Sequence, residues 1–235
     1  APTTLLAQVD ASVGGKTGVN HVKGKNLIGA FHQPATVVID SLTLATLPAR
    51  EFGAGLAEVV KYGAINDPEF LSWLESNTDR INARENEALD YLIQESVLNK
   101  ANIVRQDEKE AGIRALLNFG HSFGHALEAE TAYERFLHGE AVAIGMVVAA
   151  RLSENRGLCA RGAAERLATI LQAFDLPVSI PGNISPDGLV TALQLDKKAL
   201  ASGLRLILIE ALGKAVVDES SSPDEIARAL EQSLG

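Results

Sequence analysis

The sequence predicts a multi-domain α+β protein, in which a mainly α-helical domain with a small β-hairpin follows the tail of an α/β unit. Three observations support this fold class. Two β-prone runs flank a glycine-rich loop near the start, apolar residues recur at helical spacing after Pro48, and two further β-prone runs flank Gly213. We therefore expect one domain over residues 1–48 and a second over residues 49–235.

The first domain is predicted to contain two short strands, over residues 3–9 and 36–39, with the glycine-rich loop at residues 13–18 between them. In the second domain, apolar residues at helical spacing begin with Leu56, Val59, Val60 and Gly63 and continue with Leu89, Leu92, Ile93, Val97 and Val104. Further helices are predicted over residues 116–130, 139–156 and 160–174.

Helix ends and a hairpin complete the prediction. Gly157 is a stop signal for the helix over 139–156, and Pro177 closes the next one. Ser185 and Ser222 each precede a proline and an aspartate, which is the pattern of an N-cap followed by proline at the first helical position. Between them, residues 204–209 and 215–217 are predicted to pair as a hairpin around Gly213.

The composition limits the classes of function. The chain has 235 residues, of which 46% are apolar and 22% charged, as in a soluble globular protein. Its net charge of −9 argues against binding to nucleic acid, although a small anionic substrate can still bind where a few cations converge. The longest apolar stretch, residues 141–150, is too short to cross a membrane, so we expect a cytoplasmic protein.

Two further features concern the ends and the cysteine content. The chain starts within an apolar segment and without methionine, so we expect it to be cut from a longer protein. The single cysteine, Cys159, cannot form an intrachain disulfide or a cysteine-built zinc site.

A cluster of histidines is the first indication of chemistry. His121 and His125 are four residues apart and would share one face of a helix, while His138 is placed where the next helix should begin. Glu58 lies within an apolar segment, where an unpaired charge is costly, and Lys61 would share its face. Two imidazoles and one carboxylate leave a coordination position open, which is typical of catalytic zinc, with cobalt, iron(II) or manganese as competitors.

Other interpretations remain open at this point. An HxxxH pair alone also fits ordinary core or surface histidines. The chain offers many cations in helix or loop contexts, each of which could singly be a solvated surface charge: Lys16, Lys25, Lys61, Lys100, Arg114, Lys197 and Lys198. The segment Gly15-Lys16-Thr17 suggests a P-loop, but that motif requires glycine at the position of Asp10, which argues against an ATPase or kinase.

Five segments together resemble the 3-dehydroquinate synthases of the sugar-phosphate cyclase superfamily. They are residues 8–18, 24–31, 57–63, 116–125 and 138–140, with sequences QVDASVGGKTG, GKNLIGAF, AEVVKYG, LLNFGHSFGH and HGE. The resemblance implies an N-terminal α/β domain that binds NAD, a C-terminal helical domain that binds zinc, and an active site between them. It also implies a homodimer, and a chain that lacks most of the NAD-binding domain.

Residue roles follow from the resemblance position by position. The implied metal ligands are Glu58, His121 and His138, with Zn²⁺ first and Co²⁺ second. The implied catalytic residues are Lys16, Lys61, Lys100, Asn118 and His125, with His125 a hydrogen-bonding or proton-relay group and not a ligand. The implied substrate contacts are Asp10, Asn26, Arg114 and one of Lys197 and Lys198. The implied NAD contacts are Thr3, Thr4, Asp10, Lys16, Lys25, Thr46, Leu47 and Glu51, whereas Thr43 replaces an aromatic residue of some relatives.

The resemblance also implies a reaction. The substrate is 3-deoxy-D-arabino-heptulosonate 7-phosphate, a sugar-acid phosphate of the shikimate pathway to aromatic amino acids. Zinc as a Lewis acid assists oxidation of the C5 hydroxyl by NAD, phosphate is eliminated, and NADH returns the hydride. Ring opening and an intramolecular aldol closure then give 3-dehydroquinate, so the enzyme is a phosphate-eliminating lyase.

Three rival functions are considered. Another cyclase of the superfamily would make an amino-dehydroquinate, a deoxy-inosose or a valiolone, and the set Arg114, Asn118 and Lys197-Lys198 favours a carboxylated substrate instead. An iron-dependent alcohol or glycerol dehydrogenase usually binds metal through an aspartate, against which Glu58 argues. A noncatalytic helical module would be either a metal-storing protein or a regulatory fragment that kept the fold.

Overall fold

A computed structural model describes residues 1–21, 24–110, 112–199 and 204–235, and for residues 20, 21, 24–27 and 195–199 it describes the backbone alone. The helices are α1 (Ala49–Ile65), α2 (Pro68–Ser76), α3 (Thr78–Asn82), α4 (Asn86–Gln106), α5 (His121–Glu130), α6 (His138–Asn155), α7 (Ala163–Ala173), α8 (Pro186–Ala199) and α9 (Pro223–Glu231). Shorter helical turns are η1 (Ala7–Ala11), η2 (Ser41–Thr46) and η3 (Ile113–Asn118). The strands are β1 (Val19–His21), β2 (Gly24–Ile28), β3 (Leu206–Ala211) and β4 (Lys214–Asp218).

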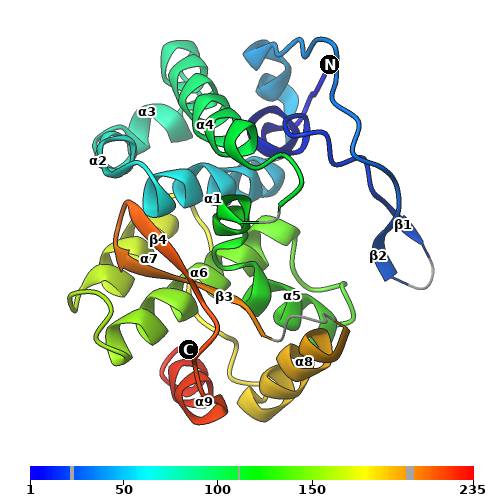
Figure 1. The fold of residues 1–235 in the computed structure, drawn as a ribbon. Coiled ribbons are helices and arrows are strands. Elements are labelled where there is room, and N and C mark those ends of the chain that lie inside the picture. Colours follow the sequence, from blue (N-terminus) through cyan, green and yellow to red (C-terminus); the bar gives the residue numbers. More distant parts are fainter. Residues whose placement is uncertain (22–23, 111, 200–203) are drawn as a thin grey trace.

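Helix α6 lies at the centre of the helical part, with α1, α5, α7, α9 and β3 packed around it (Figure 1). The stretch from Ala141 to Ala150 is apolar on every side, and all of its side chains are buried. A helix that is apolar all round must be enclosed by other elements, which explains this central position. None of the described helices is both long and apolar enough to cross a membrane.

The predicted hairpin in the C-terminal part is confirmed. Strands β3 and β4 pair antiparallel, with Ile207 opposite Val217, and Gly213 takes a φ of 91° in the turn. Ser222 caps α9 as predicted, because its hydroxyl accepts a hydrogen bond from the Glu225 N–H while the Glu225 carboxylate accepts one from the Ser222 N–H.

The strand predicted over residues 3–9 is wrong. This segment turns helically and continues as the π-helical turn η1, with the Gln8 N–H donating to the Thr4 carbonyl at 3.0 Å. The local bonds satisfy the backbone without a partner strand, and the turn buries Leu5 and Val9 against the helical part. Apolar content alone cannot tell such a turn from a short strand.

Residues 36–39 do not form the predicted strand either. They carry no regular secondary structure, and no described strand pairs with them. The pairing in this part of the chain instead joins β1 to β2 in a small antiparallel hairpin that was not predicted. The glycine-rich loop at residues 13–18 precedes that hairpin, and the division into two domains at residues 48 and 49 stays a prediction.

Glycines shift two predicted helix starts. Gly120 has a φ of 80°, so the predicted helix over 116–130 divides into the 3₁₀ turn η3 and the helix α5, which begins at His121. Gly162 has a φ of 96°, and α7 begins after it instead of at residue 160. Left-handed glycines of this kind end one helical path and let the chain start another in a new direction.

Glycines also let α5 and α6 approach each other closely. A Cβ on Gly124 would lie 3.1 Å from the Ala141 carbonyl, and a Cβ on Gly145 would overlap the Gly120 carbonyl. The start of α6 is fixed in the same way, because a Cβ on Gly139 would overlap the Ala54 carbonyl of α1. The three helices α1, α5 and α6 are therefore held at backbone contact.

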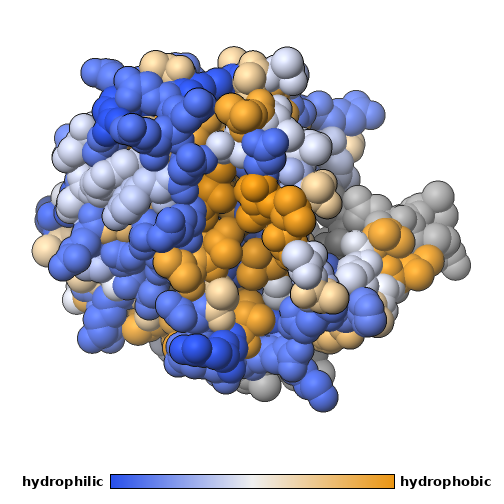
Figure 2. Space-filling view, turned by 90° about the horizontal axis from the view of Figure 1, so that it is seen from above, coloured by the Kyte–Doolittle hydropathy of each residue, from blue (hydrophilic) through white to orange (hydrophobic). Residues whose placement is uncertain are grey.

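Large apolar side chains are not all buried. Val38, Leu42 and Leu98 are among the exposed ones. Figure 2 shows that apolar surface gathers in one area of the face seen from above, with hydrophilic residues around it.

Candidate metal centre

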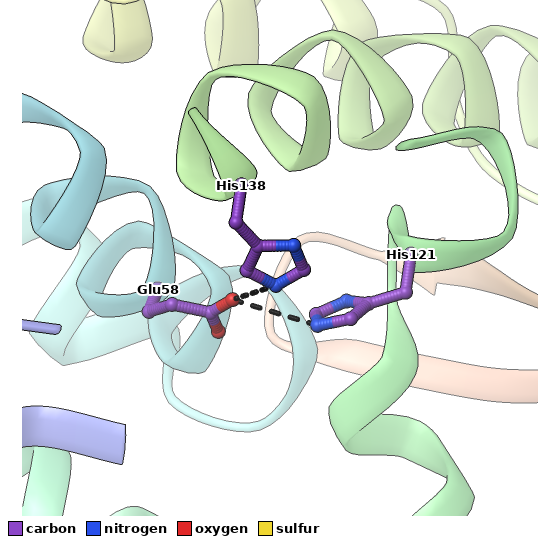
Figure 3. A group of neighbouring side chains, drawn as sticks. All are labelled: Glu58, His121 and His138. Carbon is purple, nitrogen blue, oxygen red and sulfur yellow. Dashed lines mark ion pairs between the residues drawn. The ribbon is translucent and has the colours of Figure 1, made fainter. Parts of the chain in front are cut away.

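Three side chains from three helices meet at one point (Figure 3). Glu58 comes from α1, His121 is the first residue of α5 and His138 is the first residue of α6. The Nε2 atoms of His121 and His138 lie 3.5 Å and 3.7 Å from the same atom, Oε1 of Glu58. The ligand atoms of the three residues all lie within 4.8 Å of one another, so one ion could reach them together.

Glu58 has the surroundings of a ligand. Its side chain is 1% exposed, and no described residue donates a hydrogen bond to its Oε1 atom. Lys61, one helical turn along α1, forms an ion pair with the other carboxylate oxygen, Oε2. A buried carboxylate oxygen without a donor is costly, and a cation at this position would remove that cost.

The geometry of His121 leaves a lone pair for an ion. Its Nδ1 atom lies 3.2 Å from the Phe119 carbonyl, which can only accept, so Nδ1 carries the proton and Nε2 faces Glu58 with its lone pair. Burial, with the nearby charge of Lys61 adding to it, holds the pKa of His121 well below its usual value. The ring is therefore neutral near pH 7, as a metal ligand must be.

His138 presents its two nitrogens to two carboxylates. Nε2 faces Glu58, and Nδ1 lies 3.4 Å from Oε1 of Glu128. His125 is exposed, and its ring centroid lies 5.6 Å from that of His121 and 5.8 Å from that of His138. His125, Glu128 and His138 form a second group whose ligand atoms lie within 4.8 Å of one another.

A second polar cluster joins α4 to the N-terminal segment. The Lys100 ammonium donates to the Asp10 carbonyl at 2.6 Å and lies 2.8 Å from its carboxylate, to which the Tyr62 hydroxyl also donates at 2.8 Å. Burial alone would raise the pKa of Asp10, but the charges of Lys100 and Lys61 hold it well below its usual value. Helix α1 links this cluster to the metal centre, because Tyr62 donates to Asp10 and the preceding residue, Lys61, pairs with Glu58.

The carboxylate of Glu110 brings two more predicted residues together. It forms an ion pair with Lys16 and accepts a hydrogen bond of 2.8 Å from the Asn118 amide. Arg114 is 1% exposed, and its guanidinium donates to the carbonyl of Gly14 at 2.8 Å and to that of Glu108. The buried guanidinium therefore ties η3 to the glycine-rich loop.

Among the predicted NAD contacts, Asp10 belongs to the cluster with Lys100 described above. Thr3, Thr4, Thr46 and Glu51 are exposed and Leu47 is half-buried. The Gln8 amide links the N-terminal segment to η2, because it donates to the Asp40 carbonyl and the Thr43 hydroxyl. The side chains of Lys25, Asn26, Lys197 and Lys198 lie outside the described residues.

Sequence reasoning missed Tyr62, Glu110 and Glu128. Glu128 had a usable signal, since it follows His121 by seven residues and His125 by three, which places all three on one face of α5. Glu110 lies in the charged run Asp107-Glu108-Lys109-Glu110, which looks like a solvated loop, and only its positive φ of 61° marks it as unusual.

The donor set fits a divalent ion such as zinc. One carboxylate and two imidazoles with converging free electron pairs supply three ligands, and the remaining position of a tetrahedral ion would be open to water or substrate. Closed structural zinc sites normally have four protein ligands, so the arrangement suits catalysis.

Comparison with protein families gives two matches. The family model described as 3-dehydroquinate synthase N-terminal matches residues 1–54, and the one described as 3-dehydroquinate synthase C-terminal matches residues 55–199. The 3-dehydroquinate synthase of Halorhodospira halophila is 53% identical over 99% of this chain and 66% of its own length. That of Teredinibacter turnerae is 55% identical over 92% of this chain and 60% of its own. The chain thus spans less than two thirds of these relatives.

Solved structures of two cyclases share the fold. A 2-epi-5-epi-valiolone synthase from Streptomyces hygroscopicus, with NAD⁺ and Zn²⁺ bound, matches 98% of this chain and 64% of its own with a TM-score of 0.90 and 32% identity. A 2-deoxy-scyllo-inosose synthase complexed with carbaglucose-6-phosphate, NAD⁺ and Co²⁺ matches 100% of this chain and 66% of its own, with a TM-score of 0.87 and 26% identity.

Proposed function

Because the chain belongs to the 3-dehydroquinate synthase family, we propose that it carries the metal- and substrate-binding part of an enzyme that converts 3-deoxy-D-arabino-heptulosonate 7-phosphate to 3-dehydroquinate and phosphate. The reaction class is a phosphate-eliminating lyase that uses NAD and a divalent metal. The observation that carries the proposal is the meeting of Glu58, His121 and His138 at one oxygen, in a chain about half identical to curated enzymes of this name.

The proposal assigns the metal to Glu58, His121 and His138, with Zn²⁺ first and Co²⁺ as a substitute. Both ions occur together with NAD⁺ in the solved cyclases described above. When bound, the metal supplies Lewis-acid polarisation of a substrate hydroxyl, and NAD supplies a hydride acceptor that is regenerated. The proposed NAD contacts on this chain are Thr3, Thr4, Asp10, Lys16, Lys25, Thr46, Leu47 and Glu51.

The cations of the chain are proposed to bind and orient the substrate. Lys100 is held by two oxygens of Asp10, so its ammonium keeps one direction, and a third donor proton is available for a hydroxyl or carboxylate. Lys16 and Asn118 are held by Glu110 in the same manner. Fixed donors of this kind raise the rate by holding a flexible substrate in a reactive geometry.

His125 is proposed to hold or move a proton beside the metal centre, since it is exposed on the same helix face as His121. Lys61 is proposed to face the same substrate from α1. Arg114, Asp10, Asn26 and one of Lys197 and Lys198 stay predicted substrate contacts. The proposal also includes a homodimer in the cytoplasm that acts on a small molecule and binds no nucleic acid, in keeping with the net charge of −9.

The test measures zinc content, NAD binding and phosphate release from the heptulosonate phosphate. Glu58→Gln and His121→Ala should each lose the bound zinc and any phosphate release. His32→Ala, which changes an exposed histidine that is not among the proposed site residues, should retain both. If both variants bind as much zinc as the wild type does, the assigned ligands are contradicted. Zinc without NAD affinity would indicate that this portion binds metal but does not catalyse the reaction alone.

A second candidate is another sugar-phosphate cyclase activity, favoured by the TM-scores of 0.90 and 0.87 to enzymes that make a valiolone and a deoxy-inosose. The identities to those enzymes are 32% and 26%, well below the 53% to the synthase of Halorhodospira halophila. Competition between the heptulosonate phosphate and a sugar phosphate without a carboxylate separates the two, because the proposed function requires preference for the carboxylated substrate.

A further inference from the structure

We propose that Glu128 is a positioning residue of the metal centre, whose carboxylate accepts the Nδ1 proton of His138 and so fixes the ring with Nε2 toward Glu58. The inference rests on the proposed function, since it deepens the assignment of Glu58, His121 and His138 as ligands. It adds a residue that contacts no ion itself but determines how well His138 can do so.

The placement of Glu128 follows from its helix. His121, His125 and Glu128 are spaced by four and then three residues, so α5 presents them on one face, toward the first turn of α6. The Glu128 side chain is 4% exposed, and its Oε1 atom lies 3.4 Å from Nδ1 of His138. The opposite ring nitrogen, Nε2, lies 3.7 Å from Oε1 of Glu58. The imidazole of His138 thus bridges two buried carboxylates.

The chemistry of imidazole makes this bridge directional. A neutral ring has one N–H donor and one lone pair, so whichever nitrogen faces a pure acceptor carries the proton. Both neighbours of His138 are carboxylates. The ring nitrogen that donates its proton to one carboxylate cannot bind a metal, so the opposite nitrogen is the metal ligand. With Glu128 accepting from Nδ1, the lone pair of Nε2 points to the side where Glu58 and His121 offer theirs.

The two histidines of the centre are oriented by different acceptors. His121 donates to the backbone carbonyl of Phe119, while His138 donates to a carboxylate. A carboxylate behind a ligating imidazole increases its basicity more than a neutral carbonyl does, which strengthens the bond to the ion. Burying that carboxylate is unfavourable, and contact with the imidazole N–H offsets part of this cost.

The second group, His125, Glu128 and His138, could alternatively hold an ion of its own. That would require His138 to bind one ion through each nitrogen, and hence to lose its remaining N–H proton. A hydrogen bond from the Nδ1–H group to Glu128 keeps this proton on the ring. It also leaves His125 outside the coordination shell. The positioning role is therefore the assignment that keeps His138 neutral.

The experiment measures zinc affinity of the full chain by competition with a chromogenic chelator. Glu128→Gln should weaken zinc binding about tenfold to a hundredfold, and Glu128→Ala should weaken it at least as much because no acceptor remains. The matched control is Glu130→Gln, the same chemical change at an exposed position of the same helix, which should leave the affinity unchanged. The Co²⁺ absorption spectrum of Glu128→Gln should also differ from that of the wild type.

The outcomes separate this inference from the proposed function. If the wild type binds no zinc, the ligand assignment itself fails. If the wild type binds one zinc that Glu58→Gln removes, while both Glu128 variants retain wild-type affinity and spectrum, only the role of Glu128 is refuted. Two ions per wild-type chain, of which His125→Ala loses one, would make Glu128 a ligand and overturn the positioning role. Equal unfolding midpoints of the metal-free proteins show that a lower affinity does not come from a damaged fold.

Discussion

Gly145 of α6 faces the carbonyl of Gly120 so closely that any side chain on Gly145 would overlap its oxygen atom. Gly120 directly precedes His121, and Gly145 lies two turns along the helix that His138 begins. The contact between these glycines therefore fixes the spacing of the two helices whose first residues are the proposed ligands.

Gly145→Ala is expected to destabilise the protein by about 1–3 kcal/mol, because an overpacked contact between backbones forces the helices apart. The separation of His121 from His138 should increase with it, so zinc affinity should fall as well. Chemical unfolding measures the first effect and chelator competition the second. Gly182→Ala is the control, since its added Cβ would meet its nearest atom at 3.4 Å, and a similar loss there would show that the helix contact is not special.

Zinc is expected to raise the free energy of unfolding, because the folded chain gathers three ligands that the unfolded chain does not. At a free zinc concentration one hundred times the dissociation constant, the gain is about 2.7 kcal/mol. The midpoint of thermal unfolding should therefore rise with zinc and return after chelation. Glu58→Gln should show no such rise, and a rise as large as in the wild type would exclude Glu58 as a ligand.

Asp218 gives a pH-dependent prediction away from the centre. Its side chain is 8% exposed, and it accepts hydrogen bonds from the Ser221 N–H at 3.0 Å and the Ser220 hydroxyl at 2.7 Å, besides its ion pair with Arg156. Burial opposes the charge, but the hydrogen bonds from Ser221, Arg156 and Ser220 lower the pKa of Asp218 from 3.8 to about 2.

The difference in pKa corresponds to at most about 2.5 kcal/mol of stability, which is present at pH values above the unfolded-state pKa of Asp218. Because the folded-state pKa is the lower one, this contribution is complete near pH 7 and is lost as the pH falls through 4 toward 2. Asp218→Asn should therefore be less stable than the wild type at pH 7, with a gap that narrows below pH 4 in urea unfolding. Asp175→Asn, at an exposed position, should stay within about 0.5 kcal/mol throughout.

Lys100→Met is expected to lower kcat/KM about a hundredfold or more, the usual effect of removing a fixed donor from an active site. The ammonium of Lys100 is buried against Asp10, so the variant also leaves that carboxylate with fewer donors. Steady-state assays with zinc and NAD measure the effect, and Lys109→Met serves as an exposed control. Equal activity of the two variants would remove Lys100 from the catalytic set.

The helical part of the fold could be predicted because its patterns are long. Apolar residues at helical spacing identified α1 and α4, and the turn at Gly213 identified the β3–β4 hairpin. The helix start at His121 could not be predicted, because it depends on the left-handed conformation of Gly120, which the close packing of α6 requires. The strand predicted over residues 3–9 was wrong because a short apolar run fits a helical turn as well as a strand.

For the site, spacing alone could group His121 with His125, and burial in an apolar segment could select Glu58. Spacing could not show that His138 would return to the same point, since this depends on the packing of α5 against α6. The role of Glu110 could not be predicted, because its partners Lys16 and Asn118 come from two other segments of the chain.

Both proposed histidine ligands are the first residues of their helices. Each helix carries the equivalent of about half a positive charge at its N-terminus, from the aligned dipoles of its peptide groups. The positive ends of the α5 and α6 dipoles consequently lie beside the buried carboxylate of Glu58, a favourable interaction worth about 0.3–1 kcal/mol for each helix. The backbones of two helices, together with Lys61, thus stabilise the negative charge of Glu58. Among the described residues, no side chain donates a hydrogen bond to its Oε1 atom.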